Sequence, residues 1–398
     1  MKREWQIGIA GLTAIGVGFG FARYGYGLFL PEFRAEFGLS VTAVGLIGSA
    51  TAAGYLVALL SAGVLVARRG PRPVVVAGGV AATAGMALVA VATAPVPLAI
   101  GLVLAGTSSG LVWTPFSDVV DRLVPRGSRE RVTGAIASGT AFAVVVAGPF
   151  ALLANATGWR FAWLVFAATA LVTTWYNARV LPGGRGPARA RAAGGPRSFA
   201  RAAAVPLYLT ALVYGVAGAV YWTFAMEAIE GGGAVEPLFW TLMGAAGTAG
   251  VLTGHAIVRL GVRRVQIGLF TGIAAALALL GAAPGAMPAV VASALLYGPC
   301  FMAGSGVLAV WSHQVFPERP SAGFTATVLF LGVGSVAGPA ALGAFGDRYG
   351  LGAAFLVTAA LTQLAPLARP TRAGARARGG RIPPRGMVHG AAVTGDLR

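Results

Sequence analysis

Long apolar stretches separated by short polar connections run along the whole chain. Each has about 18 to 26 residues, enough for an α-helix to cross the hydrocarbon core of a bilayer, which is about 30 Å thick. Turn-forming residues separate the stretches, among them Ala-Pro-Val-Pro at 94–97 and three glycines at 231–233. The pattern predicts twelve membrane helices, with approximate bounds 5–30, 41–66, 74–93, 96–117, 132–154, 159–181, 204–228, 236–258, 265–283, 287–312, 321–344 and 352–369.

The composition agrees with this pattern. Of the 398 residues, 57% are hydrophobic and 11% are charged, whereas soluble globular proteins have about 25% charged residues. The prediction is therefore an all-α membrane protein. The single cysteine, Cys300, excludes an intrachain disulfide and a cysteine-rich metal site, and we expect no metal or other cofactor.

The positive charges lie in alternate connections between the predicted helices. Of the 30 lysines and arginines, 26 belong to the two ends of the chain and to the connections on one side, and three, Arg34, Arg160 and Arg348, to the other side. Such an excess marks the cytoplasmic side, so both termini are predicted to be cytoplasmic. Because arginine is strongly preferred over lysine, as in G+C-rich bacterial genes, we expect a bacterial plasma (inner) membrane. The net charge of +18 then reflects topology and contact with anionic lipid, and nucleic acid is not an expected partner.

A segment rich in glycine, proline, alanine and arginine divides the chain. It covers 182–203 and is predicted to be a basic cytoplasmic linker. The expected domains are an N-terminal six-helix bundle at 1–181 and a C-terminal six-helix bundle at 204–370. The tail at 371–398 is expected to be basic, cytoplasmic and disordered.

Two motifs recur in both halves. The sequence GVLVARRGPRP at 63–73 follows the second predicted helix, and GHAIVRLGVRR at 254–264 follows the eighth. Their matching residues, each pair 191 positions apart, are Gly63, Arg68, Gly70 and Arg72 with Gly254, Arg259, Gly261 and Arg263. A Gly-Pro pair recurs as well, as Gly148 and Pro149 in the fifth helix and Gly338 and Pro339 in the eleventh. The repeat predicts two bundles that enter the membrane from the same side.

Each motif has a physical role that suits a transporter. Arginines in a tight loop can bind the carbonyl groups at helix ends, and we expect the first motif to form a cytoplasmic gate. A proline inside a membrane helix removes a backbone donor and bends the helix. A topological anchor and a packing kink are the simpler alternative for either motif alone.

On these features the chain resembles the major facilitator superfamily. The motif RYGYGLFLP at 23–31, together with AAGYLVALL at 52–60, is similar to the bacterial YbfB/YjiJ-like branch. The resemblance implies twelve helices in a 6+6 pseudo-twofold arrangement and alternating access to one central cavity. Ala67 and Val258 replace the acidic residue usual in the loop motif, so its usual charge relay is not carried over.

Arg23 is a charged residue inside the first predicted helix. On an α-helix it shares one stripe with Gly16, Gly20 and Gly27, which favours an orientation into the bundle. Placing an arginine at the membrane centre costs about 2.5 to 3.5 kcal/mol unless water or a partner is near. The alternative is that the long side chain reaches the outer headgroups.

The resemblance implies that helices 1, 4, 7 and 10 line the cavity. Their candidate substrate-cavity residues are Arg23, Tyr24, Tyr26, Trp113, Thr114, Tyr221, Trp222 and Tyr297. For each aromatic residue, packing within the bundle is an equal alternative. Glu227 could pair with Arg23 or carry a proton, and His255 could titrate near neutral pH.

The predicted function is secondary active transport of a small organic solute, with Arg23 binding an anionic group. Efflux of toxic amphipathic compounds is the alternative within this class, and a non-transporting sensor or scaffold is the alternative outside it. A membrane enzyme is not expected, because we find no catalytic grouping of histidine and acidic residues and no phosphate-binding loop. The expected partners are a small-molecule substrate, the lipid bilayer and a coupling proton, and the expected state is a monomer.

Overall fold

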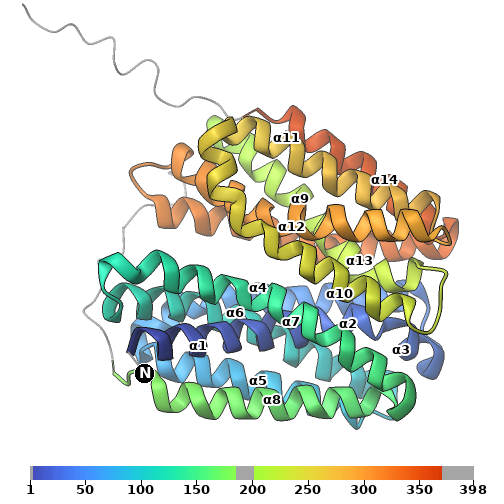
Figure 1. Cartoon of the computed structure of the whole chain (residues 1–398), viewed down its shortest axis with the longest axis horizontal. Helices are drawn as coiled ribbons and strands as arrows, with labels where there is room; N and C mark the ends of the chain where they lie inside the picture. Colours follow the sequence, from blue (N-terminus) through green and yellow to red (C-terminus); the bar gives the residue numbers. More distant parts are fainter. Residues whose placement is uncertain (1–2, 185–200, 370–398) are drawn as a thin grey trace, which may run out of the picture.

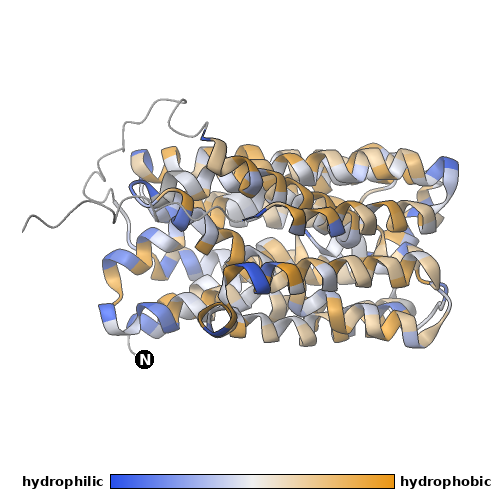
Figure 2. Cartoon of the chain, turned by 90° about the horizontal axis from the view of Figure 1, so that it is seen from above, coloured by the Kyte–Doolittle hydropathy of each residue, from blue (hydrophilic) through white to orange (hydrophobic). Residues whose placement is uncertain are grey.

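A computed structural model describes residues 3–184 and 201–369 of the chain. The predicted tail and most of the predicted linker lie outside these residues. All regular elements of the described part are helical, and they run lengthwise beside one another (Figure 1). Figure 2 shows hydrophobic residues along most of the helices, while hydrophilic residues gather mainly towards the two ends. This is the distribution that a bilayer requires of a helical bundle.

The first half of the chain forms one group of helices. They are α1 (Arg3–Ile15), the π-helix η1 (Gly16–Phe21), α2 (Gly25–Leu28), α3 (Leu30–Phe37), α4 (Val41–Arg69), α5 (Pro71–Ala90), α6 (Pro95–Leu123), η2 (Arg126–Ser128), α7 (Arg129–Thr157) and α8 (Trp159–Val180). The second half forms η4 (Ala202–Ala204), α9 (Val205–Ala228), α10 (Val235–Gly247), η5 (Thr248–Leu252), α11 (Thr253–Ala282), α12 (Met287–Val315), α13 (Pro320–Tyr349), α14 (Leu351–Leu364) and η6 (Ala365–Leu367). We call these the N-terminal and C-terminal halves.

The helices account for the twelve predicted crossings. In the described residues, nine helical segments are long and apolar enough to span a membrane, and one of them, Val235–Ala282, has 48 residues. A bend at Gly261 divides that segment into two crossings. The first crossing is broken into α1, η1 and α2, and the last, Leu351–Leu367, is short. The predicted all-α membrane fold is therefore confirmed.

Matching glycines make the corresponding turns of the two halves. Gly70, between α4 and α5, has φ 86° and ψ 170°, and Gly261 has φ 79° and ψ 155°. Gly158 and Gly350, which precede α8 and α14, form a second pair with φ 84° and 87°. These backbone conformations are strained for residues with a Cβ atom. The repeated loop motif thus corresponds to a repeated turn.

The two halves lie side by side and meet through a few helices (Figure 1). Helix α4 packs against α13, α7 against α10, and α2 and α3 against α9. We call the end of the bundle where α1 begins the terminal face, and the other end, where α3 connects to α4, the opposite face. The predicted boundaries of the domains stay a prediction, because the connection between the halves includes residues 185–200.

Candidate functional site

The π-helix η1 determines where Arg23 lies. Its hydrogen bonds span five residues: the amide of Ala22 donates to the carbonyl of Val17 at 2.9 Å, and that of Tyr24 to Phe19 at 3.0 Å. The wider turn rotates the following side chains relative to an α-helix, and such π-helical turns are frequent at functional sites. The chain then turns through residues 22–24 before α2.

The predicted glycine stripe is therefore interrupted. Gly16 and Gly20 pack against Ala143 of α7, within the N-terminal half. Gly27 instead packs against the backbone carbonyl of Trp222 on α9, in the other half. The prediction that Arg23 shares one face with these glycines is wrong, because it assumed a continuous α-helix.

Arg23 points toward α4 and lies within a group of aromatic rings. Its guanidinium carbon is 3.8 Å from the ring centroid of Tyr55, 5.8 Å from that of Tyr24 and 5.9 Å from that of Phe19. Such cation–π contacts stabilise a cation by about 0.5 to 2 kcal/mol each. Tyr55 is near the middle of the 29-residue helix α4, so the guanidinium lies at mid-bundle depth and does not extend to either face. Arg23 has no hydrogen bond or ion pair with any described residue.

Next to Arg23, the two halves meet through stacked rings. The ring of Tyr24 stacks on the indole of Trp222, with centroids 4.1 Å apart and planes 14° from parallel. Trp222 also packs edge-on against Tyr297 and Phe301 of α12. Tyr24 and Trp222, both predicted cavity residues, are thereby brought together with Arg23.

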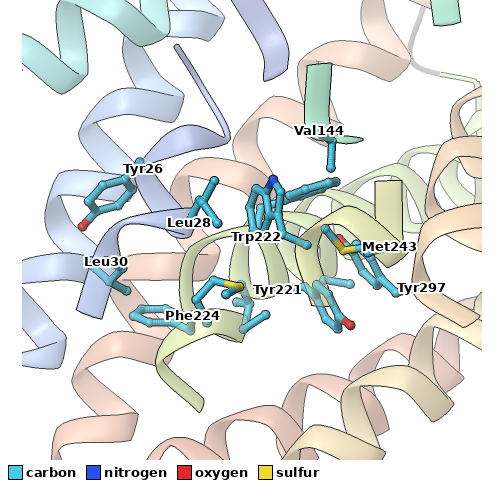
Figure 3. Packing of buried hydrophobic residues seen from close by; sticks show 14 of the residues in the cluster. Tyr26, Leu28, Leu30, Val144, Tyr221, Trp222, Phe224, Met243 and Tyr297 are labelled. Atoms are coloured by element: carbon cyan, nitrogen blue, oxygen red, sulfur yellow. The ribbon is translucent and has the colours of Figure 1, made fainter. Parts of the chain in front are cut away.

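Other predicted cavity residues are packed inside their own half. Tyr221 and Tyr297 are fully buried and stack with centroids 3.5 Å apart (Figure 3). The hydroxyls of Tyr221 and Ser293 are hydrogen-bonded at 2.7 Å, and Tyr26 donates to the carbonyl of Val44 at 2.8 Å. The prediction that these tyrosines line the cavity is not supported, because their rings and hydroxyls are used in packing. Our prediction from sequence could not separate this role from exposure to a cavity.

The remaining two cavity candidates lie on α6. Trp113 and Thr114 are half-buried. Trp113 packs on the same hydrophobic cluster as Phe19, one of the rings around Arg23. Tyr55 was not among the predicted site residues, although it stands in the AAGYLVALL motif. A cation in an apolar segment requires polar or aromatic neighbours, but only the tertiary structure shows which ones.

Glu227 pairs with Arg34, and not with Arg23 as predicted. Arg34 on α3 forms an ion pair with Glu227 at the end of α9, and its Nε donates to the carbonyl of Leu39 at 2.9 Å. The ion pair joins the two halves near the opposite face. His255, exposed near the start of α11, lies toward the terminal face and is not part of this group.

A second carboxylate joins the halves at the same face. Asp347 at the end of α13 accepts hydrogen bonds from the backbone amides of Val41 at 2.9 Å and Thr42 at 2.7 Å. These amides begin α4, so the carboxylate meets the positive end of a long helix in the other half. Deeper along the same contact, the amide of Ala340 donates to the hydroxyl of Ser49 at 2.9 Å.

A cavity of about 310 Å³ adjoins these contacts at the opposite face. Its lining residues are Leu28, Pro31, Glu32, Ala35, Ala151, Gly232, Gly233, Glu236 and Pro237. Glu32 and Glu236 come from different halves, and burial raises the pKa of the Glu32 carboxyl above its ordinary value. Glu236 accepts a hydrogen bond from the amide of Gly232 at 2.8 Å.

The residues of the predicted gate lie at the terminal face. Gly70 and Gly261 form the turns described above, and Gly63 and Gly254 have open space beside them. Arg263 donates to the carbonyl of Ala368 at 3.2 Å, within its own half. Arg72 lies near Gly183, and Arg68 and Arg259 directly precede the same turns.

The Gly-Pro pairs lie in the helices that join the two halves. Pro149 is inside α7 and Pro339 inside α13. Gly148 packs against the carbonyl of Pro237 on α10, and the Pro339 carbonyl packs against Gly45 of α4. Gly338 packs against Val216 of α9, within the C-terminal half.

Comparison with known sequences gives one family and partial relatives. Residues 15–369 match the family model described as "Uncharacterised MFS-type transporter YbfB". The chain is 31% identical over 179 residues to human "Monocarboxylate transporter 11" and 29% identical to the mouse protein, covering 45% of this chain in both cases. The matches cover 38% and 40% of those relatives, so the chain spans about two-fifths of their length.

Solved structures share the fold at low sequence identity. A point mutant of the nucleoside transporter NupG superposes with a TM-score of 0.76 at 11% identity, over 92% of this chain and 98% of that one. A bacterial homologue of the human lysosomal transporter Spinster, inward-facing and unoccupied, has a TM-score of 0.73 at 14% identity, over 92% and 96%. The D-xylose–proton symporter superposes with a TM-score of 0.73 at 15% identity, over 92% of this chain and 97% of that one.

Proposed function

The chain belongs to the major facilitator superfamily, in the family of the MFS-type transporter YbfB, and from this we propose that it moves a small organic anion by alternating access. Membership makes it a multi-pass membrane transporter that binds a small-molecule substrate, and not an enzyme. The observation that carries the proposal is Arg23, a cation at mid-bundle depth with no acidic partner in the described residues.

The environment of Arg23 favours an anionic ligand. A guanidinium presents five N–H donors, which bind carboxylates and phosphates strongly. Aromatic rings stabilise its charge but accept few of these hydrogen bonds. Glu227, the acidic residue predicted to pair with it, is held by Arg34. A bound anion would supply the missing acceptor, and an organic anion is supported by the partial relatives, which are named as monocarboxylate transporters.

We propose that the terminal face is the cytoplasmic face of a bacterial inner membrane, with both termini inside. The distribution of the basic residues supports this orientation. The halves would then be joined at the periplasmic side by Arg34 with Glu227 and by Asp347 with α4. The substrate would exchange with the cytoplasm, and rocking of the halves would expose Arg23 to the outside. A monomer with a coupling proton is the simplest form of this proposal.

Efflux of amphipathic compounds is the second candidate. It is favoured by the stacked rings of Tyr24 and Trp222 beside the site, which offer an apolar surface to a flat molecule. The two candidates differ in the role of charge, since only the first requires the guanidinium.

The test compares solutes retained by cells with and without the gene, followed by flux of the retained solutes in proteoliposomes. Arg23→Gln should abolish flux of anions while leaving insertion unchanged. Arg348→Gln is the matched control, because Arg348 also lies over a tyrosine ring, at 5.4 Å, but is exposed at the opposite face. Equal flux of anions by Arg23→Gln and the wild type would contradict the proposal, and unchanged flux of neutral compounds would favour efflux.

A further inference from the structure

Three polar groups without described partners meet at the site. They are the guanidinium of Arg23 and the hydroxyls of Tyr24 and Tyr55, none of which bonds to a described residue. Tyr55 is only 7% exposed, yet its hydroxyl oxygen is not fully enclosed by protein atoms. The hydroxyl oxygen of Tyr24 is not fully enclosed either. The rings of Tyr24 and Tyr55 both lie beside the ring of Phe19, with centroids 6.4 and 6.0 Å away. A nearly buried phenol whose hydroxyl has no partner among the described residues can donate a hydrogen bond to a bound ligand.

We propose that Tyr55, with Tyr24, determines specificity at this site by fitting it to a single carboxylate on an apolar, preferably aromatic, body. The inference rests on the proposed transport of an organic anion and narrows it to monocarboxylates. Dicarboxylates and neutral analogues are selected against.

The position of the guanidinium limits how an anion can approach. The Tyr55 ring lies 3.8 Å from its central carbon and covers one side. The N–H groups along the edge stay available, and this edge binds one planar carboxylate through two parallel hydrogen bonds. The hydroxyls of Tyr24 and Tyr55 can donate to the remaining lone pairs of the carboxylate.

The surrounding rings oppose a second negative charge. The face of an aromatic ring carries negative electrostatic potential, so it attracts the guanidinium and repels a carboxylate. Phe19 and Tyr24 border the guanidinium at 5.9 and 5.8 Å, and Trp222 stacks behind Tyr24. A second carboxylate would be desolvated among these rings without a cation of its own. An apolar or aromatic body can pack there without this penalty.

A neutral analogue fails for a different reason. It would leave the guanidinium without an anionic acceptor while displacing the water that solvates it. A site built to bind a polar group rejects a ligand lacking that group more strongly than it rejects a ligand of slightly different size. Tyr55 therefore contributes to recognition twice, through its ring and through its hydroxyl.

The test uses the full chain, purified and reconstituted, with benzoate, succinate and benzyl alcohol as probes at about neutral pH. Binding is measured by titration calorimetry and transport by flux. Tyr55→Phe keeps the ring and removes the hydroxyl, so it should weaken benzoate binding about tenfold. Tyr55→Leu removes the ring as well and should lower the ratio of benzoate to succinate affinity about tenfold. Tyr349→Phe, at a tyrosine that is 57% exposed, is the control and should match the wild type.

The outcomes separate the inference from the proposed function. Benzoate binding that depends on Arg23 but is the same in the wild type and both Tyr55 variants would overturn the inference and leave anion transport standing. A wild type that binds benzyl alcohol as tightly as benzoate would overturn both. Should Tyr55→Leu fail to fold, as judged by gel filtration, Tyr55→Phe decides, since unchanged affinity for benzoate in that variant also overturns the inference.

Discussion

Arg23 and Arg34 lie eleven positions apart in the chain and have opposite surroundings. Arg34 forms an ion pair with Glu227 of the other half and also binds the carbonyl of Leu39. Arg23 lies among Phe19, Tyr24 and Tyr55 and has no charged partner in the described residues. The paired arginine joins the halves at the opposite face. The arginine held only by rings keeps its hydrogen-bonding capacity for a ligand.

The contrast separates two uses of charge in a membrane transporter. An ion pair between rigid halves stabilises one conformation, because it breaks when the halves separate. A cation without an acidic partner in the protein does not favour either conformation through a salt bridge. It can therefore bind the substrate in both conformations. Substitutions at Arg23 and at the contacts between the halves, and a change of pH, test this distinction.

Arg23→Gln should give the largest loss of function. Removing the charge deletes two charge-assisted hydrogen bonds to the substrate, each about 1.5 to 3 kcal/mol, so anion flux should fall about 100-fold or more. The melting temperature should change little, because no protein ion pair is lost and removal of a costly intramembrane charge offsets the lost contacts with the rings. Flux into proteoliposomes and thermal unfolding in detergent check the two statements. Substantial flux with Arg23→Lys would show that charge alone suffices; a destabilised Arg23→Gln variant would mean that Arg23 has a structural partner.

Glu227→Gln should shift the balance between conformations. It leaves Arg34 without its carboxylate at the contact between the halves, at a cost of about 1 to 3 kcal/mol, so the population open at the opposite face should rise about 5- to 150-fold. The distance between spin labels at Thr93 and Ala286, exposed residues of the opposite face in different halves, reports this opening in a Cys300→Ala background.

Glu36→Gln is the matched control for that experiment. Glu36 pairs with Arg160 at 2.6 Å within the N-terminal half, and this hydrogen-bonded arginine lowers the pKa of its carboxyl. Loss of the Glu36–Arg160 pair should leave the distribution of distances between the labels at Thr93 and Ala286 unchanged. A shift as large as that of Glu227→Gln would mean that the change reflects general loosening of the bundle.

Asp347→Asn should shift the same equilibrium less. The amide can still accept one of the two hydrogen bonds from Val41 and Thr42, but it loses the charge that meets the α4 N-terminus, worth about 0.3 to 1 kcal/mol. The open population should rise about two- to fivefold in the same spin-label measurement. An effect equal to that of Glu227→Gln would show that Asp347, and not the ion pair, is the main contact.

Acidification should favour closure of the opposite face, with the smallest effect. Burial raises the pKa of Glu32 in the closed form, while exposure on opening would return it towards 4.5. The closed form therefore binds the proton more tightly, and closure gains stability as the pH falls through the raised pKa toward the ordinary one. The nearby carboxylates Glu236 and Glu227 also raise the pKa of Glu32, and a backbone hydrogen bond opposes this shift. The distances between labels at Thr93 and Ala286 should depend on pH between the raised pKa of Glu32 and its ordinary value. This pH dependence should be lost in Glu32→Gln.

Much of the architecture could be predicted from the sequence. Apolar stretches of membrane-spanning length gave twelve crossings, because a bilayer allows only helices that satisfy their own backbone hydrogen bonds. Two motifs that recur at nearly the same offset predicted the repeat. In the structure, Gly70 and Gly261 of the first motif make matching turns, in a backbone conformation that few other residues adopt. The family match at 15–369 agrees with the predicted superfamily.

The fold class, the crossings, the repeat and the presence of Arg23 inside an apolar segment follow from the amino-acid sequence, because they depend on local composition and period. The partners of individual side chains follow only from the packing of the helices. The π-helix rotated Arg23 away from the predicted stripe and towards Tyr55, Glu227 was paired with Arg34, and Tyr221 was packed on Tyr297. Side-chain partners across a bundle depend on helix rotation and on contacts between segments far apart in the chain, and an apolar pattern common to all membrane helices does not encode them.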